Sequence, residues 1–125
     1  MSTILIVQQN GTLSLDPSDV RFVVADYDAS NLKADITIAA STWTITVMRQ
    51  NGATALTKDN PAILTALEAT TALERTVGAS RATRVRLIAT TATAGDLYEV
   101  ANTITTSESP AQTKEKSFYV LIGQQ

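Results

Sequence analysis

The chain contains no cysteine and no histidine. Without cysteine it forms no disulfide, offers no thiolate to a metal ion and has no cysteine nucleophile. Without histidine it lacks the side chain whose ordinary pKa lies nearest neutrality, which excludes Ser-His-Asp triads, histidine-bound zinc and histidine pH switches. Gly-rich phosphate loops are also absent. Only carboxylate, lysine or tyrosine chemistry remains, and the sequence predicts a protein that is not an enzyme and uses no cofactor.

Charge of either sign is scarce. Of the 125 residues, 18% are charged and 44% are hydrophobic, and the formal net charge is −2. This balance predicts no strong attraction to nucleic acid or anionic membrane, because binding to phosphates requires clustered, uncompensated Lys and Arg. The apolar opening TILIV is too short for a membrane span and lacks the features of a signal peptide. We expect one globular domain, made in a reducing compartment.

Threonine occurs along almost the whole chain and mostly alternates with apolar residues, which is typical of half-buried β-strands. We expect strands over residues 2–9, 12–15, 19–27, 34–50, 54–57, 82–90, 94–106 and 117–124. Inside the fourth of these, the small stretch AAS marks a bend or a switch of face. About six to eight short strands joined by close turns predict an all-β, Ig-like β-sandwich.

The beginning of the chain is set apart by turn residues. Asn10-Gly11 predicts a hairpin between residues 2–9 and 12–15, because Asn and Gly tolerate positive φ. The sequence therefore predicts an N-terminal arm or hairpin over residues 1–15, which pairs with its own body or with a neighbour. The sandwich domain is expected over residues 16–125.

A second Asn-Gly pair, Asn51-Gly52, follows the long fourth strand. It predicts that residues 42–49 fold back against residues 54–57. The next segment, residues 59–78, leaves two structures open. Asn60 as an N-cap, Pro61 at the first helical position and Gly78 as a stop favour a short helix near residues 61–75. Three threonines within residues 61–75 and loose apolar spacing favour a loop with a short strand instead.

The aromatic residues lie in alternating strand patterns, which predicts that they belong to the core. This applies to Phe22, Trp43, Tyr98 and Phe118. In residues 94–106, Tyr98 shares one face with Val100 and Ile104. The strand over residues 82–90 has Val85 and Leu87 on one face and Arg84 and Arg86 on the other, so its arginine face is expected to be wet.

The stretch Gly95-Asp96-Leu97-Tyr98-Glu99-Val100 resembles the start of strand F in immunoglobulin-like domains, where Asp-x-Tyr-x-Cys is common. The resemblance implies that the Tyr98 hydroxyl bonds to backbone a few residues upstream and pins the corner between the sheets. Val100 stands where antibody domains carry a cysteine. The resemblance thus implies a core held by packing alone, with Trp43 packing against Val100.

A second resemblance rests on three segments read together: LKADITIAASTWTIT (32–46), AGDLYEVANTITTS (94–107) and TKEKSFYVLI (113–122). They are similar to segments of small tailed-phage virion proteins, such as fibre-to-tail adaptors and head or tail structural proteins. The apolar arm and TALEATTALERTVGAS, which looks like an insertion, depart from that pattern. The resemblance implies a structural component of the virion that joins tail or baseplate to fibres. Capsid decoration or cementing is the alternative.

The same resemblance implies that the chain binds other virion proteins, forms homo-oligomers in the particle and is located in the virion. The interface candidates are apolar arm residues, two arginines and two apolar residues of the last strand: Ile4, Leu5, Ile6, Val7, Arg84, Arg86, Tyr119 and Leu121. The arginines also have a purely structural interpretation, as solvated side chains paired with Glu68, Glu74 or Glu99.

Two further classes of function remain open. Asp26 and Asp28, with Asp16 and Asp19 nearby in sequence, have the oxygen chemistry that Ca²⁺ prefers, although they lack the spacing of an EF-hand loop. A non-viral Ig-like module that binds carbohydrate or calcium is therefore an alternative, and it predicts aromatic residues on an exposed face. An enzyme would require convergent carboxylates with shifted pKa values in a pocket. We expect turn residues at these aspartates rather than a metal site.

Overall fold

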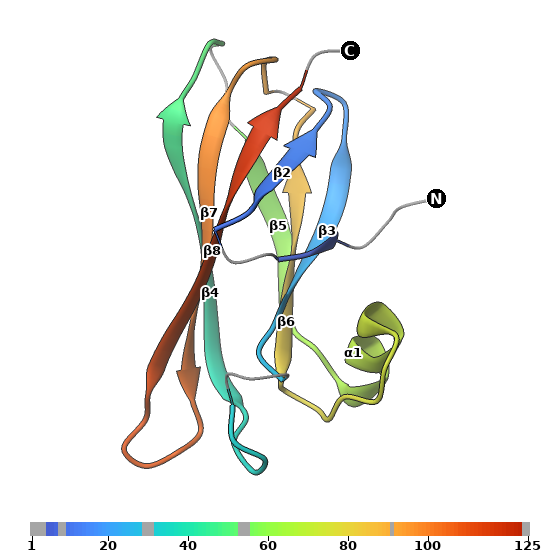
Figure 1. Cartoon of the computed structure of the whole chain (residues 1–125), viewed down its shortest axis with the longest axis vertical. Coiled ribbons are helices and arrows are strands. Elements are labelled where there is room, and N and C mark those ends of the chain that lie inside the picture. Colours follow the sequence, from blue (N-terminus) through green and yellow to red (C-terminus); the bar gives the residue numbers. More distant parts are fainter. Residues whose placement is uncertain (1–4, 8–9, 29–31, 53–55, 91, 124–125) are drawn as a thin grey trace.

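The computed structural model describes residues 5–7, 10–28, 32–52, 56–90 and 92–123. Within them, eight strands and one helix follow in the order β1 (Leu5–Ile6), β2 (Thr12–Leu15), β3 (Val20–Asp26), β4 (Ile38–Arg49), β5 (Thr57–Ile63), α1 (Ala66–Leu73), β6 (Ala82–Ile88), β7 (Leu97–Thr106) and β8 (Thr113–Ile122). The strands form two sheets, β1-β3-β6-β5 and β2-β8-β7-β4, which pack against each other (Figure 1). Ig-like sandwiches place strands A, B, E and D in one sheet and C, F and G in the other. The predicted all-β, Ig-like sandwich with one short helix is thus confirmed.

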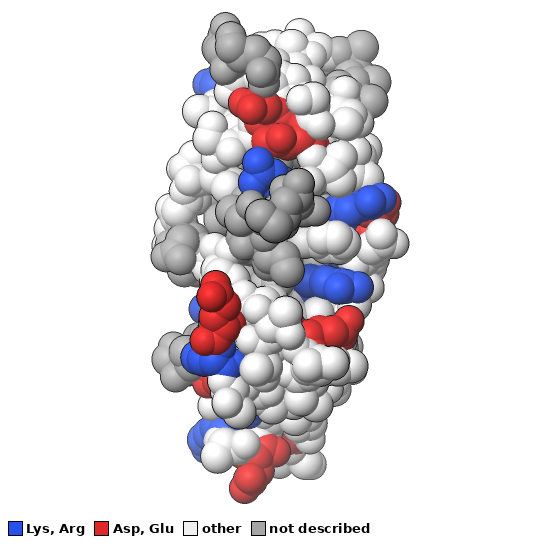
Figure 2. Space-filling view, turned by 90° about the vertical axis from the view of Figure 1, so that its right-hand side faces the viewer, with Lys and Arg blue, Asp and Glu red and all other residues white. Residues whose placement is uncertain are grey.

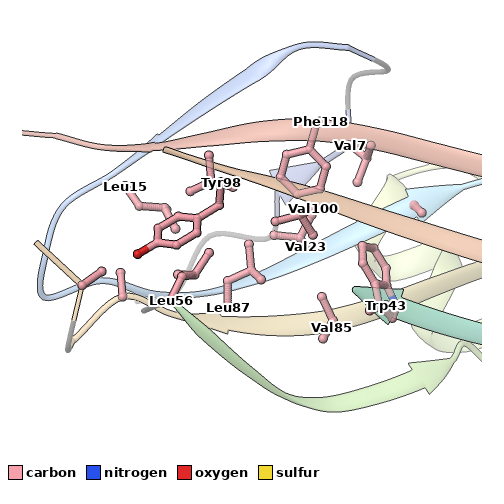
Figure 3. Close-up of a cluster of buried hydrophobic side chains, with 14 of the residues drawn as sticks. Val7, Leu15, Val23, Trp43, Leu56, Val85, Leu87, Tyr98, Val100 and Phe118 are labelled. Atoms are coloured by element: carbon pink, nitrogen blue, oxygen red, sulfur yellow. The ribbon is translucent and has the colours of Figure 1, made fainter. Parts of the chain in front are cut away.

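The core between the sheets is built by strict alternation. In β7, every second side chain from Tyr98 to Thr106 is buried, while those between them are half-exposed. Val85 and Leu87 on β6 are also buried, as predicted, and they face this row from the opposite sheet (Figure 3). Each fully buried apolar side chain of this kind stabilises the fold by roughly 1.5–3 kcal/mol relative to its exposure to water.

Trp43 and Tyr98 are both buried in this core, with 4% and 0% of their surface exposed. They lie at different levels of the sheet, because Trp43 is opposite Asn102 in the β4–β7 register and Tyr98 is opposite Val47. Figure 3 accordingly shows the two rings at opposite ends of the cluster, with Val85 and Val100 between them.

Phe22 differs from the expectation that it belongs to the core. It alternates with the core residue Val23 on β3, so its side chain lies on the outer face of its sheet, where it is only partly buried. The guanidinium group of Arg84 covers its ring, with 5.1 Å between Cζ and the ring centre. An aromatic ring on the solvent side of a strand is protected here by a cation above its face.

The predicted hairpin in the arm is wrong. β1 runs parallel to β3, with Leu5 opposite Val23, whereas β2 runs parallel to β8, with Thr12 opposite Tyr119. The two strands therefore belong to different sheets. An amphipathic strand gains more by covering the core than by pairing locally, and Val7 and Leu15 each turn into the core in this way.

The predicted return of residues 42–49 onto residues 54–57 is also wrong. β4 pairs with β7, and the chain then crosses to the other sheet, where β5 pairs with β6. Residues 53–55 lie outside the described residues. The turn residue Asn51 is bound to the β6–β7 connection instead, because its backbone N–H donates to Asp96 Oδ1 at 2.6 Å and its Nδ2 donates to the carbonyl oxygen of Ala94 at 3.2 Å.

The expected switch of face in the fourth strand is confirmed. The β4–β7 register shifts between Ile38 and Ala40. Ile38 and Trp43 are separated by an odd number of positions, yet both are buried in the same core. One extra residue at a bulge moves the following side chains to the other face.

The uncertain segment contains both of the structures left open by the sequence. A strand occupies Thr57–Ile63, and the helix occupies Ala66–Leu73, inside the range expected from the sequence. The helix begins at Thr65 rather than Asn60, because Thr65 and Glu68 form a reciprocal capping box. Asn60 instead adopts a φ of 49° in the irregular part of β5.

The helix α1 covers the outer face of the β1-β3-β6-β5 sheet at one end. Its buried Ala69 belongs to a second, small apolar cluster with Val24 and Ala82 of the sheet and Leu64 and Val77 of the flanking segments. The helix therefore adds a local layer to one sheet and leaves the other sheet without one.

In the part of the chain that is described, no helix is long and apolar enough to cross a bilayer.

Candidate interaction surfaces

A carboxylate lies at the corner where Tyr98 was expected to bond to backbone. Tyr98 instead donates its hydroxyl hydrogen to Asp96 Oδ2 at 2.7 Å. The carboxylate also accepts the backbone N–H groups of Asn51 and Thr93. Burial alone would raise the pKa of Asp96, but these hydrogen bonds outweigh it and lower the pKa. The corner therefore joins the end of β4, the loop before β7 and the core through one buried charge.

A second buried charge organises the opposite side of the fold. Arg81 is only 9% exposed, and its guanidinium group donates to Asp28 and to main-chain carbonyl oxygens, including those of Leu32, Lys33 and Ile36. Hydrogen bonding by Arg81 lowers the pKa of Asp28, partly against burial, and Arg75 adds to the effect. The planar fork of arginine suits such multiple contacts.

Two of the aspartates considered as calcium ligands, Asp26 and Asp28, are engaged in ion pairs with arginine. Arg75 Nη2 lies 2.9 Å from Asp26 Oδ2 and 3.1 Å from Asp28 Oδ2. The described parts of the chain contain no group of three or more acidic side chains that could hold a metal ion. The chemistry of this corner is therefore that of arginine–carboxylate pairing.

A polar bridge crosses the interior and was not recognised in the sequence. Asn102 is fully buried among the inward residues of β7, and its Nδ2 donates to Ser41 Oγ at 2.9 Å. Ser41 Oγ lies 2.8 Å from Thr83 Oγ1 of the other sheet, to which the indole Nε1 of Trp43 also donates at 3.4 Å. The sign in the sequence was Asn102 itself, a single amide side chain among the mostly apolar residues that alternate on the inward face of β7. Such a bridge fixes how the two sheets lie on each other.

The two arginine candidates lie side by side on β6, and both have acidic neighbours. Arg84 Nη1 lies 3.7 Å from Glu68 Oε2 of α1, one of the partners expected from the sequence. Arg86 donates two hydrogen bonds of 2.7 and 2.6 Å to the carboxylate of Asp59 on β5, a partner that the sequence did not indicate. Figure 2 shows acidic and basic residues interleaved on the side that carries α1. This face presents ion pairs rather than uncompensated positive charge.

The apolar candidates of the last strand lie on the outer face of the other sheet. Tyr119 and Leu121 are half-buried and alternate with the buried Val120. Their neighbours in register on β7 are Glu99 and Leu97. α1 packs on the opposite sheet, so no described helix covers this face. It is a sheet surface with three larger apolar groups, Leu97, Tyr119 and Leu121, near the end of β8.

Most of the remaining outer face of this sheet consists of small residues. On β4 the outward side chains include Thr42, Thr44 and Thr46, all exposed, and in the β4–β7 register they lie opposite Thr103, Ala101 and Glu99. Small side chains of similar length make the surface of a sheet nearly flat. The face can therefore lie close to another flat surface.

The apolar candidates of the arm differ in their exposure to solvent. Ile4 lies outside the described residues, and only the strand position of Leu5 is described. Ile6 is 36% exposed, whereas the next residue, Val7, lies in the core. A hollow of about 100 Å³ opens beside them, lined by Ile6, Val7, Gly11, Thr12, Leu13, Val23 and Phe118. Of the apolar arm candidates whose side chains are described, only Ile6 faces outward.

The strand β4 is a further surface that the sequence did not reveal. It is the outermost strand of its sheet and, at 12 residues, the longest strand described. The sequence had predicted that residues 54–57 pair with this strand, which would have covered the edge. Val47 and Met48, near its end, are 47% and 53% exposed.

No protein-family model matches the chain. None of the curated proteins compared with it matches either. The features that bear on function are therefore the surfaces described above and the resemblance of three short segments.

Proposed function

We propose that the chain is a structural component of a tailed-phage virion and binds neighbouring virion proteins as an adaptor between tail or baseplate and fibres. The observation that supports this most is the position of the three segments that resemble such proteins. They overlap β4, β7 and β8, which are three neighbouring strands of one sheet. The resemblance therefore applies to one continuous surface instead of three scattered pieces.

The proposed mechanism is assembly through that sheet. Its outer face carries short threonine and alanine side chains with Tyr119 and Leu121 near one end. Apolar groups of this kind can be buried against a neighbour, and the small residues around them permit close approach. The protein then acts by binding, in the virion, and requires no cofactor.

Purified particles of the phage that encodes the chain provide the test. We expect peptides of this chain to band with the particles in a density gradient at a constant ratio to the major capsid protein, as measured by quantitative mass spectrometry. Separation of tails from capsids should leave the chain with the tails. Recovery with the capsids would support a decoration role instead, and a chain absent from washed particles would contradict the proposal.

A matched pair of variants tests the proposed surface. Tyr119→Lys places a charge on the outer face, where it is opposite Glu99 and can pair with it, so folding should be retained. Thr57→Lys makes the same change of charge at an exposed site on β5 of the other sheet. We expect a several-fold loss of incorporation into particles for Tyr119→Lys and normal incorporation for Thr57→Lys. Equal incorporation of both variants would exclude this face.

A further inference from the structure

We propose that a second copy of this chain pairs with the free edge of β4, antiparallel and about a two-fold axis, so that two sheets join into one of eight strands. The inference concerns self-association alone and holds whether or not the chain belongs to a virion. Main-chain hydrogen bonds along the edge would supply the affinity, as in other cases of strand addition.

The first observation is that the edge is open. One side of β4 is paired with β7, and the described chain places no strand on its other side. In the upper half of Figure 1, β4 lies at the outside of the molecule with β7 beside it. The backbone N–H and C=O groups on the free side thus form a template for another strand.

The second observation is the contrast with the other edges. The edge strand β5 carries Lys58, Asp59 and Pro61 and has an irregular register between Asp59 and Ala62. Charges, proline and bulges of this kind prevent edge pairing. The edge strands β1 and β2 are only two and four residues long. In β4, by contrast, residues 40–47 keep a regular register and include no charged residue and no proline.

The third observation is that β4 is complementary to itself. With Thr44 on the two-fold axis, Thr44 faces Thr44 of the second copy, Thr42 faces Thr46, and Trp43 faces Ile45. These are threonine pairs and an aromatic pair with a β-branched residue, both favourable across antiparallel strands. In this register, inward-facing residues of one copy lie opposite inward-facing residues of the other. The two layers of the sandwich therefore continue from one copy to the next.

The same register accounts for the exposed apolar residues at the end of the strand. Val47 comes opposite Ser41 of the second copy, and Met48 comes opposite Ala40. Both Val47 and Met48 are about half-exposed in the single chain. Pairing would remove part of this apolar surface from water, which adds to the main-chain contribution.

Disulfide trapping tests the pairing and its register. Residues that face each other on antiparallel strands have Cα atoms about 4.5–5.5 Å apart, which is within the span of a disulfide. The chain has no cysteine of its own. We expect Thr44→Cys to form a linked dimer under mild oxidation several-fold faster than Thr103→Cys, which lies on the same face of the interior strand β7. Equal rates for the two variants would overturn the proposal.

Sedimentation velocity over a concentration series supplies the second measurement. We expect the natural chain to show reversible dimerisation. Thr44→Lys should reduce it at least tenfold, because two like charges would meet at the axis, and Thr103→Lys should not. Circular dichroism verifies that both variants fold. A natural chain that remains monomeric, or equal loss in both variants, contradicts the proposal. Incorporation into particles by a monomeric chain would contradict this pairing but leave the proposed function standing.

Discussion

Tyr98, the second residue of β7, donates its hydroxyl hydrogen to the carboxylate of Asp96, which directly precedes the strand. The carboxylate also accepts backbone N–H groups from Asn51 and Thr93, so three parts of the chain converge on one buried charge. In the Ig-like corner described above the tyrosine bonds directly to backbone. Here the hydroxyl group donates to an aspartate side chain, which in turn accepts main-chain N–H groups. This arrangement accounts for the aspartate just before the strand and the tyrosine two positions later.

Removal of the Asp96 carboxylate should therefore destabilise the fold. Asp96→Ala leaves the Tyr98 hydroxyl and two backbone N–H groups without their acceptor, and a buried unsatisfied donor is costly. We expect a loss of about 2–3 kcal/mol in the free energy of unfolding, measured by urea denaturation. Asp35→Ala, at an exposed position, is the control and should change little. Equal losses in the two variants would show that the corner has no special role.

The lowered pKa of Asp96 also predicts a dependence of stability on acid. Because the carboxyl group is more acidic in the folded than in the unfolded state, its contribution is complete above the unfolded pKa of about 4 and is lost as the pH falls through the folded pKa. Asp96→Asn should weaken the fall in unfolding free energy below about pH 4. Asp28 and Glu68 have lowered pKa values too, so part of the dependence should persist. An unchanged profile in Asp96→Asn would contradict the assignment.

The sequence predicted what depends on alternation and missed what depends on distant partners. Alternation placed Val100 and Leu87 inside, because burial on one face of a strand leaves a local pattern. The turn at Asn51 was misassigned because Asn-Gly preference is local, whereas the partner that binds Asn51 lies 45 residues further along the chain. The open edge of β4 was missed for the same reason. Which strands are neighbours is a long-range property, and the outer candidates Tyr119 and Leu121 could be found only because they alternate with core residues.

The buried tyrosines predict loss of stability in alkali. Burial, and then the neighbouring Asp96 carboxylate, raise the pKa of Tyr98 to about 12, and burial raises that of Tyr27 as well. Neutral tyrosine thus stabilises the folded state fully below the unfolded pKa of about 10, and this stability is lost as the pH rises towards the folded value. In Tyr119→Phe, only Tyr27 and Tyr98 remain to titrate. We expect their tyrosinate absorbance to appear together with unfolding, and ionisation in the folded state near the ordinary pKa would contradict this.

Gly95 should tolerate no side chain. Its φ is 93°, and a Cβ atom would lie 2.5 Å from Asn51 Nδ2, which is held by a hydrogen bond to Ala94. We expect Gly95→Ala to lower the free energy of unfolding by roughly 1–3 kcal/mol. Gly78→Ala is the matched control, because the nearest atom to its added Cβ is Arg81 Cδ at an ordinary 3.5 Å. Thermal unfolding of both variants decides the matter, and similar midpoints would contradict a conformational requirement at Gly95.

The buried Arg81 should be far more sensitive to substitution than the neighbouring Arg75. Arg81→Met would leave Asp28 and several carbonyl oxygens without their donor, and we expect a loss of about 3–5 kcal/mol, typical of breaking a buried ion pair. Arg81→Lys keeps the charge but loses the planar fork, so it should restore only part of the stability. Arg75→Met breaks ion pairs of a side chain that is 40% exposed, where solvent weakens them, and should cost about 1 kcal/mol or less. Urea denaturation of the three variants gives the ranking. If Arg81→Met proved no more harmful than Arg75→Met, the ordered segment around Leu32 and Lys33 would have to depend on other contacts.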